Sequence, residues 1–201
     1  MSVRGFTIIA AATLVCGAIS GAAAQAPAKN AKSPPAKQPA AKSAPTPAPA
    51  AGSTEPTLVG QFGTWGAYTA TPNGKRVCFA LAKPSASKTT PANRPRDPAY
   101  AFISTRPAEK VVNEVSIMIG YQLKPGSESS LEIGNARYAM YAQGDGLWIK
   151  NAAEEERMVE ALRKGSDVTV KGVSAKGTES TDTFSLKGLS QALDKLAQTC
   201  R

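Results

Sequence analysis

Hydrophobic and polar residues alternate in short runs over most of the chain after residue 57. The clearest runs span residues 76–82 and 114–119, and a period of two is typical of strands with one buried face. Turns rich in glycine, proline and asparagine separate such runs, and the proline-rich segment 84–98 is predicted to be a long surface loop. The predicted strands are 63–69, 76–82, 100–105, 114–119, 130–133, 137–141, 147–150, 167–173 and 181–186.

Two segments follow a helical period instead. Asn151 and Glu154 have the form of a capping box, which predicts a helix over 151–163 that Gly165 ends. A second helix is predicted over 189–198, where three leucines fall on one face. Many short strands with two peripheral helices predict a mainly β fold, an immunoglobulin-like β-sandwich.

The first 24 residues have the pattern of a signal peptide. Arg4 precedes a short apolar run, and Ala22-Ala23-Ala24 has the form that signal peptidase accepts, so we expect cleavage after Ala24. Cys16 raises the alternative of a lipoprotein, which Val15 disfavours because such sites prefer a small residue there. We therefore expect a periplasmic or secreted protein with no transmembrane segment after cleavage.

Residues 25–57 are rich in alanine, proline and lysine and carry no aliphatic or aromatic side chain larger than alanine. Such a segment cannot drive burial, and we predict a disordered linker. Four lysines against one glutamate make it basic. We interpret it as a solubilising spacer, although contact with peptidoglycan or another anionic surface remains open.

The formal net charge of +9 belongs only partly to the folded domain, which we place at residues 58–201. Arg4 supplies one charge and the linker three, so the domain keeps +5, from 19 basic and 14 acidic residues. These charges form no basic stripe with interleaved aromatic residues, so nucleic acid is not an expected partner.

The cysteines and the absence of histidine constrain the chemistry. After signal cleavage only Cys78 and Cys200 remain, and we expect a disulfide between them in an oxidising compartment. A chain without histidine has no histidine-based triad and no histidine ligand for a metal. No cofactor or metal is expected.

Aromatic side chains and one arginine pair are the candidates for a recognition surface. The aromatic candidates are Trp65, Tyr68, Tyr121, Tyr138, Tyr141 and Trp148, each of which could equally pack in the core. Trp148, beside a predicted turn, is the strongest of them, with Tyr141 close in sequence. Arg94 and Arg96 could clasp carboxylates or phosphates, or Arg96 could pair locally with Asp97.

Four motifs in residues 58–201 resemble the invasion-associated locus B family of exported alphaproteobacterial proteins. They are Phe62-Gly63-Thr64-Trp65, the glycine and cysteine at 74 and 78, the strand at 115–123, and Ser185-Leu186-Lys187-Gly188-Leu189 with the helix after it. The chain is a divergent member with fewer cysteines, since Thr69 lies where members typically carry one. The resemblance implies a β-sandwich, a role at the envelope or in host-cell interaction, and no catalytic residues.

The expected function is therefore a non-enzymatic binding module whose envelope or host partner is unknown. One alternative is a carboxylate-dependent hydrolase acting on peptidoglycan through residues such as Asp145 or Glu114. A second is a structural spacer of the envelope.

Overall fold

The computed structural model describes residues 55–200, which hold eleven strands, two α-helices and three short 3-10 helices. The strands are β1 (Thr57–Phe62), β2 (Trp65–Ala70), β3 (Val77–Ala82), β4 (Ala86–Thr90), β5 (Tyr100–Arg106), β6 (Val111–Met118), β7 (Ser129–Ile133), β8 (Ala136–Gln143), β9 (Gly146–Ile149), β10 (Asp167–Val173) and β11 (Glu179–Ser185). The helices are η1 (Pro72–Gly74), η2 (Pro107–Glu109), η3 (Ala152–Glu154), α1 (Glu155–Lys164) and α2 (Leu189–Thr199). The predicted signal peptide, Cys16 and the linker up to residue 54 lie outside the described residues.

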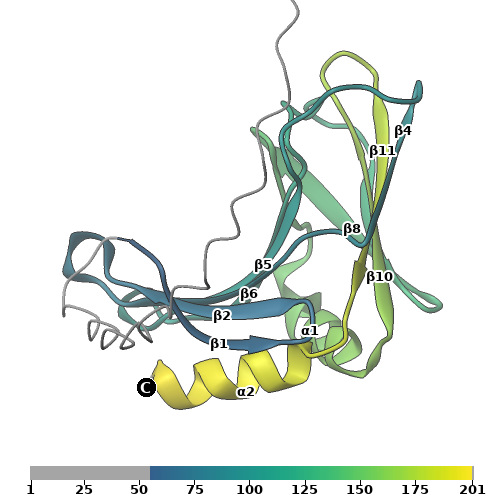
Figure 1. Ribbon diagram of the computed structural model, residues 1–201. Coiled ribbons are helices and arrows are strands. Elements are labelled where there is room, and N and C mark those ends of the chain that lie inside the picture. The colour runs from purple at the N-terminus through teal and green to yellow at the C-terminus, as the bar shows by residue number, and fades with distance from the viewer. Residues whose placement is uncertain (1–54, 201) are drawn as a thin grey trace, which may run out of the picture. The chain divides into compact units, whose positions relative to one another are not determined.

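All eleven strands belong to one antiparallel sheet, in the order β1-β2-β3-β5-β6-β9-β8-β7-β10-β11-β4. The mainly β class with two peripheral helices is thus confirmed. The sheet is continuous but bends along β5 and β6 (Figure 1). We call β1-β2-β3 the first half of the sheet and β9-β8-β7-β10-β11-β4 the second half. Helix α2 lies beneath the first half, and the face of that half opposite α2 is on the inside of the bend (Figure 1).

The second half of the sheet curls until the loop after β4 reaches the end of β6. The backbone N–H of Asp97 donates to the carbonyl oxygen of Gly120 over 3.0 Å. Gly120 has φ +84°, and a Cβ atom there would collide with the Asp97 carbonyl. Only glycine allows this close approach, so residue 120 is where the curl closes.

Helix α2 packs against β1, β2 and β3. Its buried side chains are Leu189, Ala192, Leu193 and Leu196. The strand residues Ala67, Cys78 and Ala80 are fully buried, and their small side chains let the helix approach the sheet closely. This packing forms much of the core of the first half.

The start of α2 is fixed by a glycine and a tryptophan. Gly188 has φ +94° and lies against the backbone of Phe62, where a Cβ atom would clash. The indole N–H of Trp65 donates to the Ser185 carbonyl oxygen over 2.9 Å, and Trp65 is 1% exposed. The motifs at 62–65 and 185–189 therefore meet in space, 120 residues apart along the chain.

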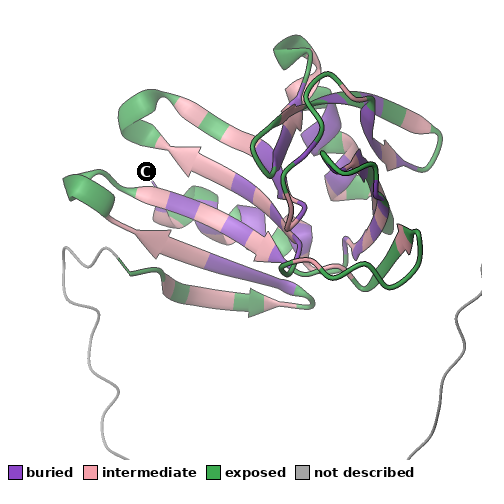
Figure 2. Ribbon diagram, turned by 90° about the horizontal axis from the view of Figure 1, so that it is seen from above, coloured by how far each residue is buried: buried purple, intermediate pink, exposed green. Residues whose placement is uncertain are grey.

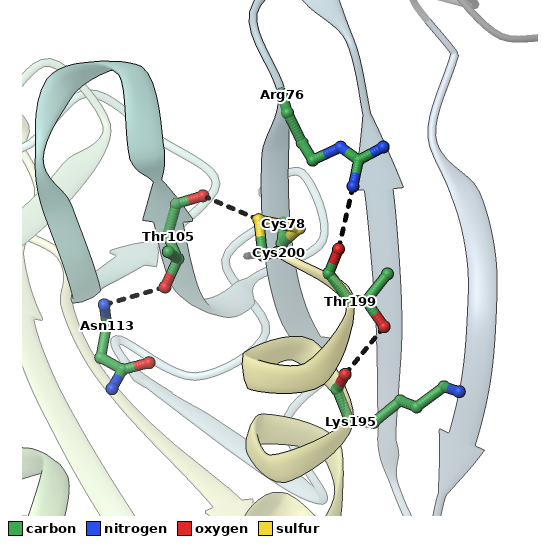
Figure 3. The surroundings of a disulfide bond; sticks show 7 residues. All are labelled: Arg76, Cys78, Thr105, Asn113, Lys195, Thr199 and Cys200. Carbon is green, nitrogen blue, oxygen red and sulfur yellow. Dashed lines mark hydrogen bonds between the residues drawn. A yellow bond between two sulfur atoms is a disulfide. The ribbon is translucent and has the colours of Figure 1, made fainter.

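The end of α2 is held by the predicted disulfide between Cys78 and Cys200, which is confirmed (Figure 3). It joins β3 to the residue that caps the C-terminus of α2, with Cα atoms 6.1 Å apart and a sequence separation of 122 residues. Beside it, the Arg76 guanidinium donates to the Thr199 carbonyl oxygen over 2.9 Å (Figure 3).

Two strands differ from the sequence prediction. The segment 84–98 contains β4, so it is not entirely a loop as predicted. β4 has no large hydrophobic residue and is mostly exposed, and it is held by its backbone pairing with β11. The sequence pattern also contains no prediction for β1, where a bulge between Leu58 and Gly60 breaks the alternation.

The two α-helices agree with prediction. The Asn151 side chain accepts from the Ala153 backbone N–H, which opens η3 and then α1, and α1 ends before Gly165. Within residues 55–200, no helix combines the length and apolar character needed to cross a bilayer.

We predict that removing the disulfide destabilises the domain markedly. The disulfide restricts the unfolded chain, so its removal increases the conformational entropy of the unfolded state. The Cys78→Ser/Cys200→Ser variant should therefore lose about 2–5 kcal/mol of unfolding free energy. Its melting temperature should fall by roughly 10 °C. Wild-type protein with reductant should show the same fall. Equal melting temperatures with and without reductant would show that the bond contributes nothing to stability.

Candidate binding face

The sheet face opposite α2 carries a band of large uncharged side chains. Neither α1 nor α2 covers it, and Figure 2 looks onto the part of this face formed by the first strands, with α2 behind them. Most of the band is partly exposed, in contrast to the fully buried residues on the α2 side. We call it the aromatic face, and it consists of Leu58, Tyr68, Phe79, Leu81, Tyr100, Phe102, Met118, Tyr141 and Trp148.

The strand register places these residues on one face. Tyr68 lies opposite Phe79, and the neighbouring row runs from Leu81 to Phe102. Ser116 of β6 continues that row, since it pairs with Phe102 on one side and Trp148 on the other. Trp148 in turn lies opposite Tyr141. The aromatic face therefore crosses seven neighbouring strands, from β1 to β8.

The rings contact one another across the strands. Tyr68 and Phe79 are stacked, with centroids 5.4 Å apart and planes 13° from parallel. A second stacked pair, Tyr141 and Trp148, has centroids 6.0 Å apart and an interplanar angle of 28°. Phe102 lies between the two pairs and contacts Phe79 at 5.9 Å. Such aromatic pairs contribute stabilising energy in addition to that of burying the rings, and so they fix the positions of the rings.

Two glycines form the floor beneath the rings. A Cβ atom on Gly146 would fall on the six-membered ring of Trp148, and one on Gly66 would fall on the ring of Tyr68. Each ring thus lies over the backbone of the residue two positions before it. The missing side chain also helps to form a hollow of about 350 Å³ between Gly66, Tyr68 and Leu81.

The polar atoms of the aromatic residues separate them into two groups. Trp65, Tyr121 and Tyr138 each donate to a backbone carbonyl oxygen of the domain. The hydroxyls of Tyr68, Tyr100 and Tyr141 and the indole N–H of Trp148 have no hydrogen-bond partner among residues 55–200. The aromatic face therefore presents stacking surface together with four unused polar groups.

Charges lie at the margins of the aromatic face. The Lys83 ammonium is 5.7 Å from the centre of the Tyr100 ring. Near the opposite margin the Arg106 guanidinium donates to Glu114 over 2.8 Å and to Glu109 over 2.7 Å. These two hydrogen bonds raise the pKa of Arg106. The nine side chains of the face are themselves neutral.

The structure places the predicted site residues in different surroundings. Trp148 and Tyr141 are adjacent on the aromatic face, and Tyr141 is 44% exposed. Trp65 and Tyr138 are buried in the core, and Tyr121 packs against it. Arg94 is exposed on the loop after β4.

Arg96 points inward, so the two arginines form no clasp. Its guanidinium pairs with Asp182 of β11, in place of the expected neighbour Asp97, and donates to the Ile119 carbonyl oxygen over 2.9 Å. The Arg96 side chain is 10% exposed and that of Asp182 is fully buried. The hydrogen bonds to Asp182 raise the pKa of Arg96.

The Asp182 carboxylate is satisfied from several sides. The Ser87 hydroxyl donates to it over 2.6 Å, while both terminal nitrogens of Arg96 donate to its two oxygens. The Arg96 guanidinium also lies 5.9 Å from the centre of the Tyr121 ring. Sequence reasoning missed Asp182, whose only signal is that it shares the inward phase of β11 with Phe184.

The carboxylates considered for hydrolysis are dispersed. Glu114 lies near the start of β6 and is paired with Arg106. Asp145 is exposed in the turn before β9, which lies beside the opposite end of β6, where Met118 pairs with Gly146. Glu155 is closer to Glu114, and burial raises its pKa, yet it accepts the Val115 backbone N–H. In the described stretch, no three cysteine, aspartate or glutamate side chains are placed to hold a metal ion.

The family model described as Invasion associated locus B (IalB) protein matches residues 65–197. The chain belongs to the IalB family. No curated protein and no solved structure matched it. The match begins at Trp65 and ends in α2, so this IalB domain includes the contact between β2 and the β11–α2 turn. It also spans eight of the nine residues of the aromatic face, all except Leu58.

We predict that Arg96 is required for stability. Arg96→Met leaves the buried Asp182 carboxylate without its partner, which should cost about 3–5 kcal/mol of unfolding free energy in urea denaturation. Arg94→Met, two residues away and exposed, should change stability by less than about 0.5 kcal/mol. Arg96→Met/Asp182→Leu should recover part of the loss. Equal stability of the two single variants would contradict the role of the pair.

Proposed function

We propose that this IalB protein is an exported, non-enzymatic binding module that recognises an envelope or host component through its aromatic face. The observation that carries the proposal is a band of large side chains, left uncovered by the domain's own helices on the inside of the sheet's bend. Large apolar patches with polar margins are typical of interaction sites. Tryptophan and tyrosine dominate the energetics of such sites.

The proposed location is the periplasm or the extracellular space. It is supported by the signal-peptide pattern of residues 1–24 and by the disulfide, since such bonds persist in oxidising compartments. The basic segment 25–57 would then be a spacer between the domain and whatever surface retains it.

The hydrolase alternative receives less support. A glycoside hydrolase needs two carboxyl groups on either side of one bond. Glu114 and Asp145 do not meet, and Glu155 is engaged with the backbone of β6. The spacer alternative does not account for the unused polar groups of the aromatic face.

We predict that Trp148→Ala/Tyr141→Ala abolishes partner capture. Truncating two adjacent rings at the exposed end of the band removes both stacking surface and two hydrogen-bonding groups, and hot-spot aromatic residues typically cost more than 1 kcal/mol each. The measurement is capture of components from envelope and host-surface fractions by the immobilised mature protein.

The controls are Val112→Ala, an exposed side chain in the hollow beside α1, and Arg94→Ala. Both should retain capture, and circular dichroism at the assay temperature should show that every variant is folded. Equal capture by wild type and the double variant would refute the assignment of the face. Loss with Arg94→Ala alone would move the site to the loop after β4.

A further inference from the structure

We propose that the aromatic face binds a neutral, unbranched β-1,4-linked amino-sugar chain, which is the chemistry of the glycan strand of peptidoglycan. This inference rests on the proposed function and deepens it by naming the ligand class. It follows from three properties of the face: its length across seven strands, the position of charged side chains at its margins and its unused polar atoms.

The extent favours a linear polymer. Neighbouring strands of a sheet lie about 4.8 Å apart, so a band across seven strands is about 29 Å long when measured along the bent sheet. Its two stacked ring pairs, on β2–β3 and on β9–β8, lie toward opposite ends with Phe102 between them. A ligand that uses the whole face must therefore present repeated flat surfaces along its length. A β-linked sugar chain does so, because each ring offers a C–H face to an aromatic ring.

The polar atoms discriminate between a sugar and an apolar partner. Three tyrosine hydroxyls and the Trp148 indole N–H lie along the band without a partner in the domain. A helix or an acyl chain laid across the face would bury these groups unpaired, at a cost of about 1–3 kcal/mol each. Sugar hydroxyls and N-acetyl amides can both donate and accept, so they satisfy these groups while the sugar rings stack.

An extended peptide fits less well for a separate reason. A peptide gains affinity on a sheet by pairing with an edge strand. The backbone groups of β2, β3, β5, β6 and β9 under the band are already paired on both sides. A peptide crossing these strands would leave its own N–H and C=O groups without partners from the sheet.

The distribution of charge on and around the aromatic face is compatible with a peptidoglycan strand. The register places Glu114 next to the band, but its carboxylate is paired with Arg106 at the margin, so the band between the margins matches a neutral sugar backbone. The exposed Lys83 at the margin is placed for the acidic peptide stems that a peptidoglycan strand carries to its side. Of the two locations proposed above, the periplasm is the compartment that contains this polymer.

The test is titration calorimetry of the mature full-length protein with chitohexaose, together with co-sedimentation with purified peptidoglycan sacculi. Wild type should bind both. Trp148→Ala/Tyr141→Ala should weaken chitohexaose binding at least about tenfold. Tyr141→Phe keeps the ring and should lose severalfold. Cellohexaose, which lacks the N-acetyl amides, should bind more weakly than chitohexaose.

Val112→Ala should bind as wild type does, and circular dichroism at the assay temperature excludes misfolding of each variant. Failure of wild type to bind either glycan, or binding unaffected by the double variant, would overturn the inference. Equal binding of cellohexaose would overturn the assignment to an amino-sugar chain. If the double variant loses capture from envelope fractions although wild type ignores both glycans, the proposed function stands and only the ligand class falls.

Discussion

The packing of α2 on one side of the sheet is the constraint from which the rest of the domain follows. Ala67, Ala80 and Cys78 leave room for the helix, and the disulfide to Cys200 holds its far end on β3. The near end is held where Gly188 meets the backbone of Phe62. A helix fixed at both ends on one face cannot shield the other face. The large side chains there must pack against one another across the strands, with their outer surfaces toward solvent.

Polar side-chain atoms are paired with one another in the curled half of the sheet but unpaired on the aromatic face. In the curled half, Arg96 and Asp182 are buried together, and their hydrogen bonds to Ser87 and to the Ile119 carbonyl leave few groups unpaired. A buried ion pair is costly to break and weak as a source of net stability, so its value here is in fixing where the loop after β4 closes. On the aromatic face the polar atoms stay unpaired because solvent, or a ligand, can reach them.

Much of this architecture is encoded locally. Period-two alternation, turn residues and two amphipathic stretches predict most strands and both helices, and the cysteine count predicts the disulfide. β4 is not predicted because it has almost no hydrophobic residues, and β1 is not predicted because a bulge interrupts its alternation.

The site is less predictable than the fold. Trp148 stands out beside a turn, but its continuation to Phe102, Phe79 and Tyr68 depends on strand order, which alternation does not specify. Asp182 as the partner of Arg96, 86 residues away, is hidden for the same reason.

The two tryptophans provide the most direct measurement of the central claim that the face opposite α2 is the binding face. Trp65 is buried with its indole N–H on the Ser185 carbonyl, while Trp148 lies on the aromatic face with its indole N–H unpaired within the described domain. In a proton–nitrogen correlation spectrum the two indole resonances report the two sides of the sheet separately. Added chitohexaose should shift the Trp148 resonance progressively to saturation and leave the Trp65 resonance in place. A spectrum in which the Trp148 resonance stays fixed at saturating ligand, or in which only Trp65 responds, would contradict the account.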